Sequence, residues 1–215
     1  MKGERMYGAF LRLKGRSCLV VGGGPVAERK VISLLECGAD VTVIAPQGTD
    51  FIVKRAEDGT IRWEARPFQS GDATPFSLII AATDSVEVNR QVYEEGEANG
   101  RLVNVVNDQA LGNFTVPAVI RRGALSVAIS TSGAAPVVAK KLREELESFL
   151  GPEIELFLDK VAEVRKRLLA EVPEVERRTL LLRKLVNSEL LSMMRQGEHE
   201  DAEQLLERIL EGLEE

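Results

Sequence analysis

Ser17-Cys-Leu-Val-Val21 runs directly into Gly22-Gly-Gly-Pro-Val-Ala27, and this stretch decides the fold. The first five residues form a short apolar run that predicts a buried strand, and the next six fit the pattern G-x-G-x-x-A at the start of a helix. In this pattern Gly22 allows a tight turn, Gly24 lets the backbone approach a pyrophosphate, and Ala27 permits close packing of the helix on the sheet. The unpaired N–H groups at the start of such a helix bind phosphate groups. The stretch therefore predicts a dinucleotide-binding turn, and the alternative is a glycine-rich turn without a ligand.

Strand and helix patterns alternate through the first half of the chain. We expect strands at 17–21, 41–44, 61–65, 77–82 and 102–106, and helices at 25–37, 50–58 and 85–99. The inner strands are continuously apolar, which is typical of a parallel sheet covered by helices on both faces. The predicted fold class is therefore α/β, with a Rossmann-type parallel sheet that binds NAD.

The second half of the chain has a different pattern. Two strand-like runs, 115–120 and 125–130, are joined across Arg122-Gly123 as in a β-hairpin, and a helix is expected at 136–150. Breaks at Gly151-Pro152, at Pro173 and near Gly197 then divide a region of about three helices. We predict an NAD-binding domain at 1–113, a dimerisation domain at 114–150 and a helical C-terminal domain at 151–215. About 40 residues rarely fold alone, so the middle segment is expected to pack against a second copy or, alternatively, on the first domain.

Composition and charge exclude several classes of protein. The 215 residues are 44% apolar and 29% charged, which fits a globular chain with a core rather than a disordered one. No apolar run is long enough for a membrane span and no signal peptide is visible, so a cytoplasmic protein is expected. The net charge of −6 gives no support to a partner made of nucleic acid. Two cysteines and one histidine offer neither a disulfide framework nor a built-in metal site.

One window of the sequence is locally basic. Residues 109–143 contain no Asp or Glu, although acids make up about one residue in six of the chain. The window carries the basic side chains Arg121, Arg122, Lys140, Lys141 and Arg143. A local basic surface attracts an anionic small molecule, and the alternative is an ordinary solvated face.

Polar residues at the ends of the predicted strands are candidates for the site. The second strand ends in Ile44-Ala-Pro-Gln47, which lacks the acidic residue that usually binds the ribose hydroxyls. The loop also has no nearby Arg or Lys that would bind a 2′-phosphate. This pattern weakly favours NAD over NADP. Asp108 follows a later strand at the same edge and is a candidate for proton transfer or, alternatively, a turn residue. Ser130-Thr-Ser-Gly133 before Pro136 has the composition of an anion site or of a simple helix cap.

Several longer strings, taken together and in order, resemble one known family. They are Leu13-Lys-Gly-Arg-Ser-Cys-Leu-Val-Val-Gly-Gly-Gly-Pro-Val-Ala-Glu-Arg-Lys30, Val41-Thr-Val-Ile-Ala-Pro46, Ala81-Ala-Thr-Asp84, Asn104-Val-Val106, Phe114-Thr-Val-Pro117 and Val127-Ala-Ile-Ser-Thr-Ser-Gly133. The chain resembles precorrin-2 dehydrogenase, the dehydrogenase/ferrochelatase part of sirohaem synthases. The resemblance covers about residues 7–150, and the helical tail fits the family's third domain.

The resemblance implies a homodimeric enzyme that uses NAD to oxidise precorrin-2 to sirohydrochlorin. Some members of the family also insert Fe²⁺ into sirohydrochlorin, so a bifunctional enzyme with ferrochelatase activity stays open. A different alternative is a non-catalytic regulatory dimer that senses NAD. The tetrapyrrole substrate carries many carboxylates, which fits the acid-free basic window.

The resemblance also assigns residues to the site. The expected cofactor-binding residues are Gly22, Gly23, Gly24, Pro25, Val26, Ala27, Pro46, Gln47, Ala82 and Thr83. The expected substrate-binding residues are Asn104, Arg121, Arg122, Ser130, Ser132, Lys140, Lys141 and Arg143. A family Asp follows the Asn-Val-Val sequence directly, but this chain has Asn107 there and Asp108 one place later. Asn107 cannot act as a base, so either Asp108 takes over or the reaction depends mainly on orienting the substrate against NAD.

Overall fold

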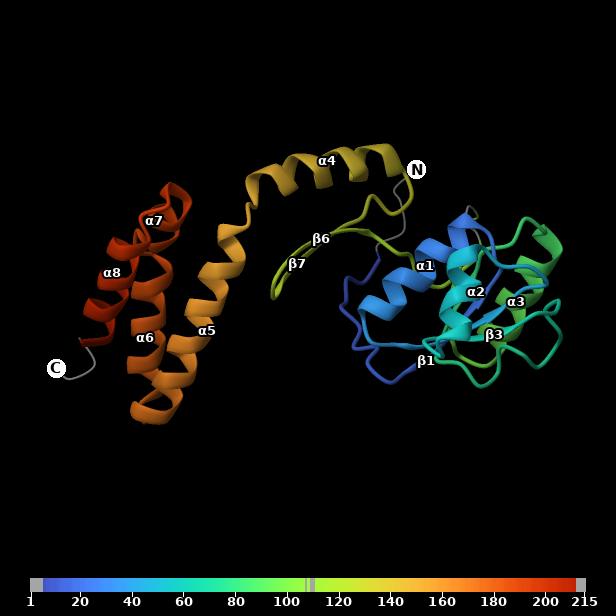
Figure 1. The fold of residues 1–215 in the computed structure, drawn as a ribbon, viewed down its shortest axis with the longest axis horizontal. Coiled ribbons are helices and arrows are strands. Elements are labelled where there is room, and N and C mark those ends of the chain that lie inside the picture. Colours follow the sequence, from blue (N-terminus) through green and yellow to red (C-terminus); the bar gives the residue numbers. More distant parts are fainter. Residues whose placement is uncertain (1–5, 107, 109–110, 212–215) are drawn as a thin grey trace. The chain divides into compact units, whose positions relative to one another are not determined.

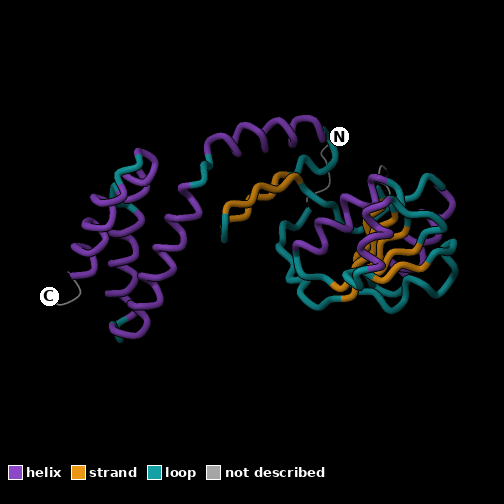
Figure 2. Tube along the Cα trace, in the orientation of Figure 1, coloured by secondary structure: helices purple, strands orange, loops and turns teal. Residues whose placement is uncertain are grey.

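The computed structural model describes residues 6–106, 108 and 111–211 of the chain (Figures 1 and 2). The backbone divides into two compact units, Met1–Val116 and Pro117–Glu215. Within the described residues, no helix combines the length and the apolar character that crossing a lipid bilayer requires.

The first unit is built on a parallel sheet with the strand order β3-β2-β1-β4-β5. The strands are β1 (Ser17–Val21), β2 (Asp40–Ile44), β3 (Arg62–Glu64), β4 (Leu78–Ala81) and β5 (Leu102–Val105), and the helices are α1 (Pro25–Glu36), α2 (Asp50–Glu57) and α3 (Val86–Ala98). Because β1 pairs with β2 on one side and with β4 on the other, the chain reverses its direction of winding at β1. In open α/β sheets, ligands bind at such a switch point, outside the carboxyl ends of the strands.

Two apolar cores lie on the two faces of this sheet. Successive side chains of a strand point to opposite faces, so Cys18 and Val20 enter one core while Leu19 and Val21 enter the other. Residues of α1 and α2 complete the first core, and Val92 of α3 belongs to the second. The predicted class, a Rossmann-type parallel sheet covered on both faces, is confirmed.

The second unit begins with an antiparallel hairpin, β6 (Ala118–Arg122) and β7 (Leu125–Ile129), followed by α4 (Pro136–Phe149). Arg122 ties the hairpin to the end of α4, since its Nε donates to the carbonyl oxygen of Leu150 (2.8 Å) and its guanidinium to that of Glu147 (3.2 Å). Strand β6 starts three residues later than expected. Pro117 precedes it and has no N–H to donate to a partner strand.

In the described part of the second unit after α4, residues 150–211, the chain forms four helices, where about three were expected. They are α5 (Glu153–Glu171), α6 (Val175–Val186), α7 (Leu190–Gln196) and α8 (His199–Glu211), and they enclose an apolar core that includes Leu168, Leu185 and Leu190. The break that the sequence patterns missed lies between α6 and α7, at Ser188. Its hydroxyl donates to the carbonyl oxygen of Leu185 (2.7 Å) and accepts from the N–H of Leu190 (3.3 Å). A serine side chain that bonds to nearby backbone in this way competes with helix hydrogen bonding.

Candidate functional site

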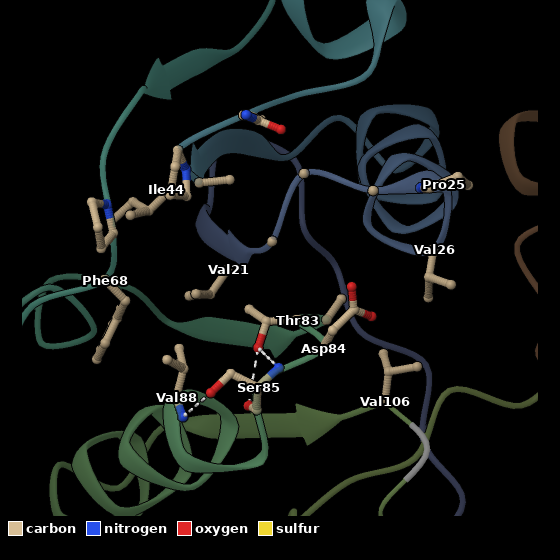
Figure 3. Close-up of a pocket in the computed structure, with 18 residues that line it drawn as sticks. Val21, Pro25, Val26, Ile44, Phe68, Thr83, Asp84, Ser85, Val88 and Val106 are labelled. Carbon is tan, nitrogen blue, oxygen red and sulfur yellow. Dashed lines mark hydrogen bonds between the residues drawn. The ribbon is translucent and has the colours of Figure 1, made fainter.

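A cleft of about 460 Å³ opens at the carboxyl ends of β1, β2 and β4 (Figure 3). Its lining comes from five short segments: the glycine loop with the start of α1, the end of β2, Pro67-Phe68, the segment from Ala82 to Val88, and Val106. The volume lies in the range of small-molecule and cofactor sites. Nine of the ten expected cofactor-binding residues line this cleft. The tenth, Ala27 in the first turn of α1, is fully buried in the apolar core.

The first two glycines of the loop are required by backbone contacts. Gly22 has φ +123°, which favours glycine, and a Cβ there would overlap the carbonyl oxygen of Ala82. A Cβ on Gly23 would overlap the carbonyl oxygen of Gln47 and lie 2.9 Å from its carbonyl carbon. Hydrogen bonds from Gly22 N–H to the Ile44 carbonyl (3.0 Å) and from Thr49 N–H to the Gly23 carbonyl (3.0 Å) hold the loop in this place.

Gly24 differs from Gly22 and Gly23 because a side chain added at this position would face open space. It has φ −81° and ψ −176°, and a Cβ there would meet no atom within 4 Å. Gly24 is the N-cap of α1, no side chain caps the helix, and Pro25 follows at the first helical position. The N–H groups of Val26 and Ala27 precede the first helical hydrogen bond, so they are available to an anion at the positive end of the helix dipole. Room beside Gly24 together with an uncapped helix start fits a pyrophosphate.

The loop after β2 forms one end of the cleft. Gln47 lines it, in the place where dinucleotide-binding folds hold the ribose of adenosine. The indole Nε1 of Trp63 donates to the carbonyl oxygen of Ala45 (3.0 Å), and the N–H of Ala45 donates to the Glu64 carbonyl (3.2 Å). Strand β3 therefore fixes the position of this loop. Trp63 was not among the residues predicted to form the site, and its only signal was its place as an aromatic residue on an edge strand.

The loop after β4 forms the opposite wall, where Thr83, Asp84 and Ser85 lie (Figure 3). Asp84 is the one charged side chain among the described residues that line the cleft. Thr83 is held by the side chain of Asn89 on α3 through three hydrogen bonds. Asn89 was also missed; a single amide among the apolar positions of a helix was its only signal.

Two of the candidates at the end of the sheet, Asn104 in β5 and Asp108 just after it, do not line the cleft. Asn104 donates from Nδ2 to the carbonyl oxygen of Phe114 (3.1 Å), which holds the chain that follows β5. Asp108 accepts from the N–H of Leu111 through Oδ1 (3.3 Å), a contact of the turn type. Val106 lines the cleft, and Asn107 lies outside the described residues.

The basic candidates of the second unit have acidic neighbours in space. The acid-free window ends just before Glu144, and α4 places Glu144, Glu145 and Glu147 one turn beyond the basic residues. The ion pairs are Lys140–Glu144 (3.9 Å), Lys141–Glu145 (3.7 Å), Arg143–Glu147 (2.7 Å) and Arg122–Glu147 (3.6 Å). The two lysine pairs are largely exposed and contribute little to stability. Arg121 lies in β6 opposite Ser126 of β7.

The serine-rich turn before α4 makes local hydrogen bonds. Ser130 Oγ accepts from the N–H of Ser132 (3.1 Å), and Thr131 Oγ1 accepts from the N–H of Ala135 (3.2 Å). Ser132 has φ +48°, an uncommon left-handed conformation for a residue other than glycine. The turn thus leads into α4 through side-chain contacts with its own backbone.

No metal centre is formed by the part of the chain that the structure describes, because no three His, Cys, Asp or Glu side chains gather there. Burial, with smaller contributions from Asp40 and Cys37, raises the pKa of the Cys18 thiol to about 11. This thiol is therefore a core group and is not poised to act as a nucleophile or as a metal ligand.

The sheet order, the glycine loop and the cleft together define a dinucleotide-binding protein of the Rossmann class. A family model described as "Putative NAD(P)-binding" matches residues 9–118. Two further models follow along the chain, "Sirohaem biosynthesis protein central" at 122–148 and "Sirohaem synthase dimerisation region" at 155–210. The chain belongs to the precorrin-2 dehydrogenase family, which forms the dehydrogenase part of sirohaem synthases.

Individual relatives give the extent of the match. A solved structure described as "SirC, precorrin-2 dehydrogenase" is 31% identical, with a TM-score of 0.80, and the alignment covers 94% of this chain and all of that one. The "Siroheme synthase" of Methylococcus capsulatus is 39% identical over 92% of this chain and 42% of its own length. "Siroheme synthase 1" of Cronobacter sakazakii is 39% identical over 94% of this chain and 43% of its own length. The chain thus spans less than half the length of these curated relatives.

Proposed function

We propose that this protein oxidises precorrin-2 to sirohydrochlorin with NAD⁺. The observation that carries this proposal is the cleft beside Gly24, which has the room and the helix start that a pyrophosphate requires. It occurs in a chain that aligns over the whole length of a precorrin-2 dehydrogenase. The reaction removes one hydride and one proton from the substrate, so the site must hold the cofactor, orient the tetrapyrrole and accept a proton.

The preference for NAD⁺ over NADP⁺ rests on the lining of the cleft. Gln47 can exchange hydrogen bonds with the ribose hydroxyls, and the described residues that line the cleft include no Lys or Arg that would pair with a 2′-phosphate. A phosphate buried there without a cationic partner would lose its hydration without compensation.

We assign different roles in the reaction to different residues of the chain. The glycine loop and the start of α1 hold the pyrophosphate, and Ala82 and Thr83 shape the wall beside the nicotinamide. A bound nicotinamide ring supplies the hydride acceptor. Asp108 is the proposed proton acceptor. Asp84, which lines the cleft, is the carboxylate against which that role has to be tested.

The substrate carboxylates are assigned to Asn104, to the serine turn and to the basic residues of the second unit. A tetrapyrrole carboxylate can replace Glu144 or Glu145 as the partner of Lys140 or Lys141, because these two exposed pairs are weak. The active form is proposed to be a homodimer, as the matched dimerisation region supports.

The test is a metal-free, anaerobic reaction of the purified protein with precorrin-2 and NAD⁺, followed by the absorbance of sirohydrochlorin. Conversion that requires NAD⁺ supports the proposal, and NADH binding without conversion contradicts it and favours the regulatory dimer. Asp108→Asn and Asp84→Asn are compared in the same assay. Loss of kcat in Asp108→Asn alone supports its role, whereas full kcat removes Asp108 from the mechanism. Iron insertion is scored separately, as sirohaem formed from sirohydrochlorin and Fe²⁺ without NAD⁺.

A further inference from the structure

Asn89 is the only polar or charged residue that is buried among those whose burial the structure describes (6–106, 108, 111–198 and 200–209), with 7% of its surface exposed. Three hydrogen bonds of its side chain go to a single residue, Thr83. The Oδ1 atom accepts from the N–H (3.2 Å) and the hydroxyl (2.8 Å) of Thr83, and Nδ2 donates to the Thr83 carbonyl (3.0 Å). Burying an amide is unfavourable unless it is fully hydrogen-bonded, so this pairing is specific.

The residue that Asn89 holds forms a wall of the cleft. Thr83 lines the cleft, whereas Asn89 itself lies behind the wall and does not. Because both the N–H and the carbonyl of Thr83 are bound, its peptide planes cannot rotate freely, and neither can that of Ala82 before it. The carbonyl oxygen of Ala82 is the atom against which Gly22 of the glycine loop packs. One buried amide therefore fixes the part of the wall that contacts the phosphate loop.

We propose that Asn89 is a positioning residue for the nicotinamide half of the cofactor and acts through the backbone of Thr83. The inference rests on the proposed function, since it needs a dinucleotide in the cleft. It predicts that a change at Asn89 alters cofactor binding beyond any change in stability. A purely structural amide would alter stability alone.

The test uses Asn89→Asp in the full-length protein, with NADH binding followed by its fluorescence. An ionised carboxylate at this position accepts from the Thr83 N–H but repels the Thr83 carbonyl. A protonated one donates to that carbonyl and restores the native pairing. Burial raises the pKa of such a carboxyl group above the usual value of about 4. NADH affinity should therefore approach the wild-type value at about pH 5 and fall about tenfold below it at about pH 8.

Few other titratable groups lie close to the new carboxyl group of Asn89→Asp along the chain or on the strands packed against α3. Strands β4 and β5, which pack against α3, carry no titratable side chain. The titratable or charged groups closest to position 89 along the chain are Asp84 in the loop and Glu87, Arg90 and Tyr93 on α3 itself. These groups are present in the wild type as well, so the ratio of variant to wild-type affinity isolates the new carboxyl group.

Glu95→Gln is the matched control. Glu95 lies on the same helix and also binds backbone, since it accepts from the N–H of Gly71 (2.9 Å) and of Ala73 (2.8 Å), but it does not line the cleft. This variant should lose stability while its NADH affinity follows the wild type at every pH. If Asn89→Asp fails to fold, Asn89→Leu takes its place, because leucine has a similar size and forms no side-chain hydrogen bonds. This variant should bind NADH weakly at every pH.

The outcomes separate the inference from the function on which it rests. Wild-type affinity in both Asn89 variants, or the same loss in Glu95→Gln, overturns the positioning role while NADH binding by the wild type still stands. A wild-type protein that does not bind NADH overturns the proposed function and the inference with it. Affinity that is lost at high pH and regained at low pH in Asn89→Asp alone supports the positioning role.

Discussion

Gly23→Ala should mainly lower the stability of the protein and Gly24→Ala should mainly lower its affinity for NADH, although the two residues are adjacent. At Gly23 the added Cβ overlaps the Gln47 carbonyl and lies 3.1 Å from the Cβ of Ala45. The overlapped atoms belong to the backbone, so no side-chain rotation relieves the clash. Overpacking of this kind costs about 1–3 kcal/mol. The movement also strains the hydrogen bond from Thr49 N–H to the Gly23 carbonyl, worth about 1 kcal/mol.

The sum predicts that Gly23→Ala lowers the free energy of unfolding by about 2–4 kcal/mol and the melting temperature by about 10 °C. Gly24→Ala places its Cβ in open space at a backbone conformation open to any residue, so it should cost no more than about 1 kcal/mol. The methyl group then occupies the position where the pyrophosphate approaches, and NADH binding should weaken at least about tenfold.

Urea denaturation followed by circular dichroism and NADH titration, both applied to each variant, provide the measurements. Gly23→Ala should lose stability strongly, whereas Gly24→Ala should lose NADH binding with little loss of stability. A Gly23→Ala protein as stable as the wild type would refute the account of the loop contacts. A Gly24→Ala protein with unchanged NADH affinity would refute the placement of the pyrophosphate.

Three further predictions concern the ends of the cleft and the core. Trp63→Phe removes the indole hydrogen bond to Ala45, worth about 1 kcal/mol, so NADH affinity measured by titration should fall a few-fold with kcat unchanged; a fall in kcat alone would contradict this. NADP⁺ should compete with NADH at least about tenfold less well than NAD⁺ does, and Gln47→Arg should narrow that gap, because a guanidinium pairs with a 2′-phosphate. Cys18, whose pKa is raised to about 11, has about one thiol in a thousand ionised at about pH 8, so alkylation read by mass spectrometry should label Cys37 first and Cys18 only in urea. Equal labelling of the native protein would contradict its burial.

The features that the sequence predicted well are those with local causes. The strand before Gly22 is apolar throughout, and the glycine spacing has a direct steric meaning, so the strand–turn–helix unit could be read from one short stretch. The parallel sheet followed because apolar strands alternate with helices. The break between α6 and α7 was missed because Ser188 ends a helix through side-chain hydrogen bonds, without the glycine or proline that usually marks such a point.

The features that the sequence did not predict depend on contacts across the fold. Trp63 binds the carbonyl of Ala45, eighteen positions away, and nothing in an edge-strand pattern indicates that partner. Asn89 binds Thr83, which is only six positions away, but this pairing depends on the path of the loop that joins β4 to α3, and the helix pattern does not indicate that path. Residues 109–143 contain no acidic residue, yet α4 brings Glu147 beside Arg122 and Arg143. The sequence window alone therefore suggested a more positive surface than the folded chain has.

The topology of the sheet explains why the first two glycines of the loop cannot be replaced by larger residues. Strand β1 lies between β2 and β4, so the loop that leaves its carboxyl end must pass between the ends of both neighbours. Gly22 touches the carbonyl of Ala82 just after β4, and Gly23 touches that of Gln47 just after β2. Side chains at these two positions would push apart the very loops that line the cleft. Gly24 is under no such constraint from the protein itself, and therefore its lack of a side chain is best explained by a ligand.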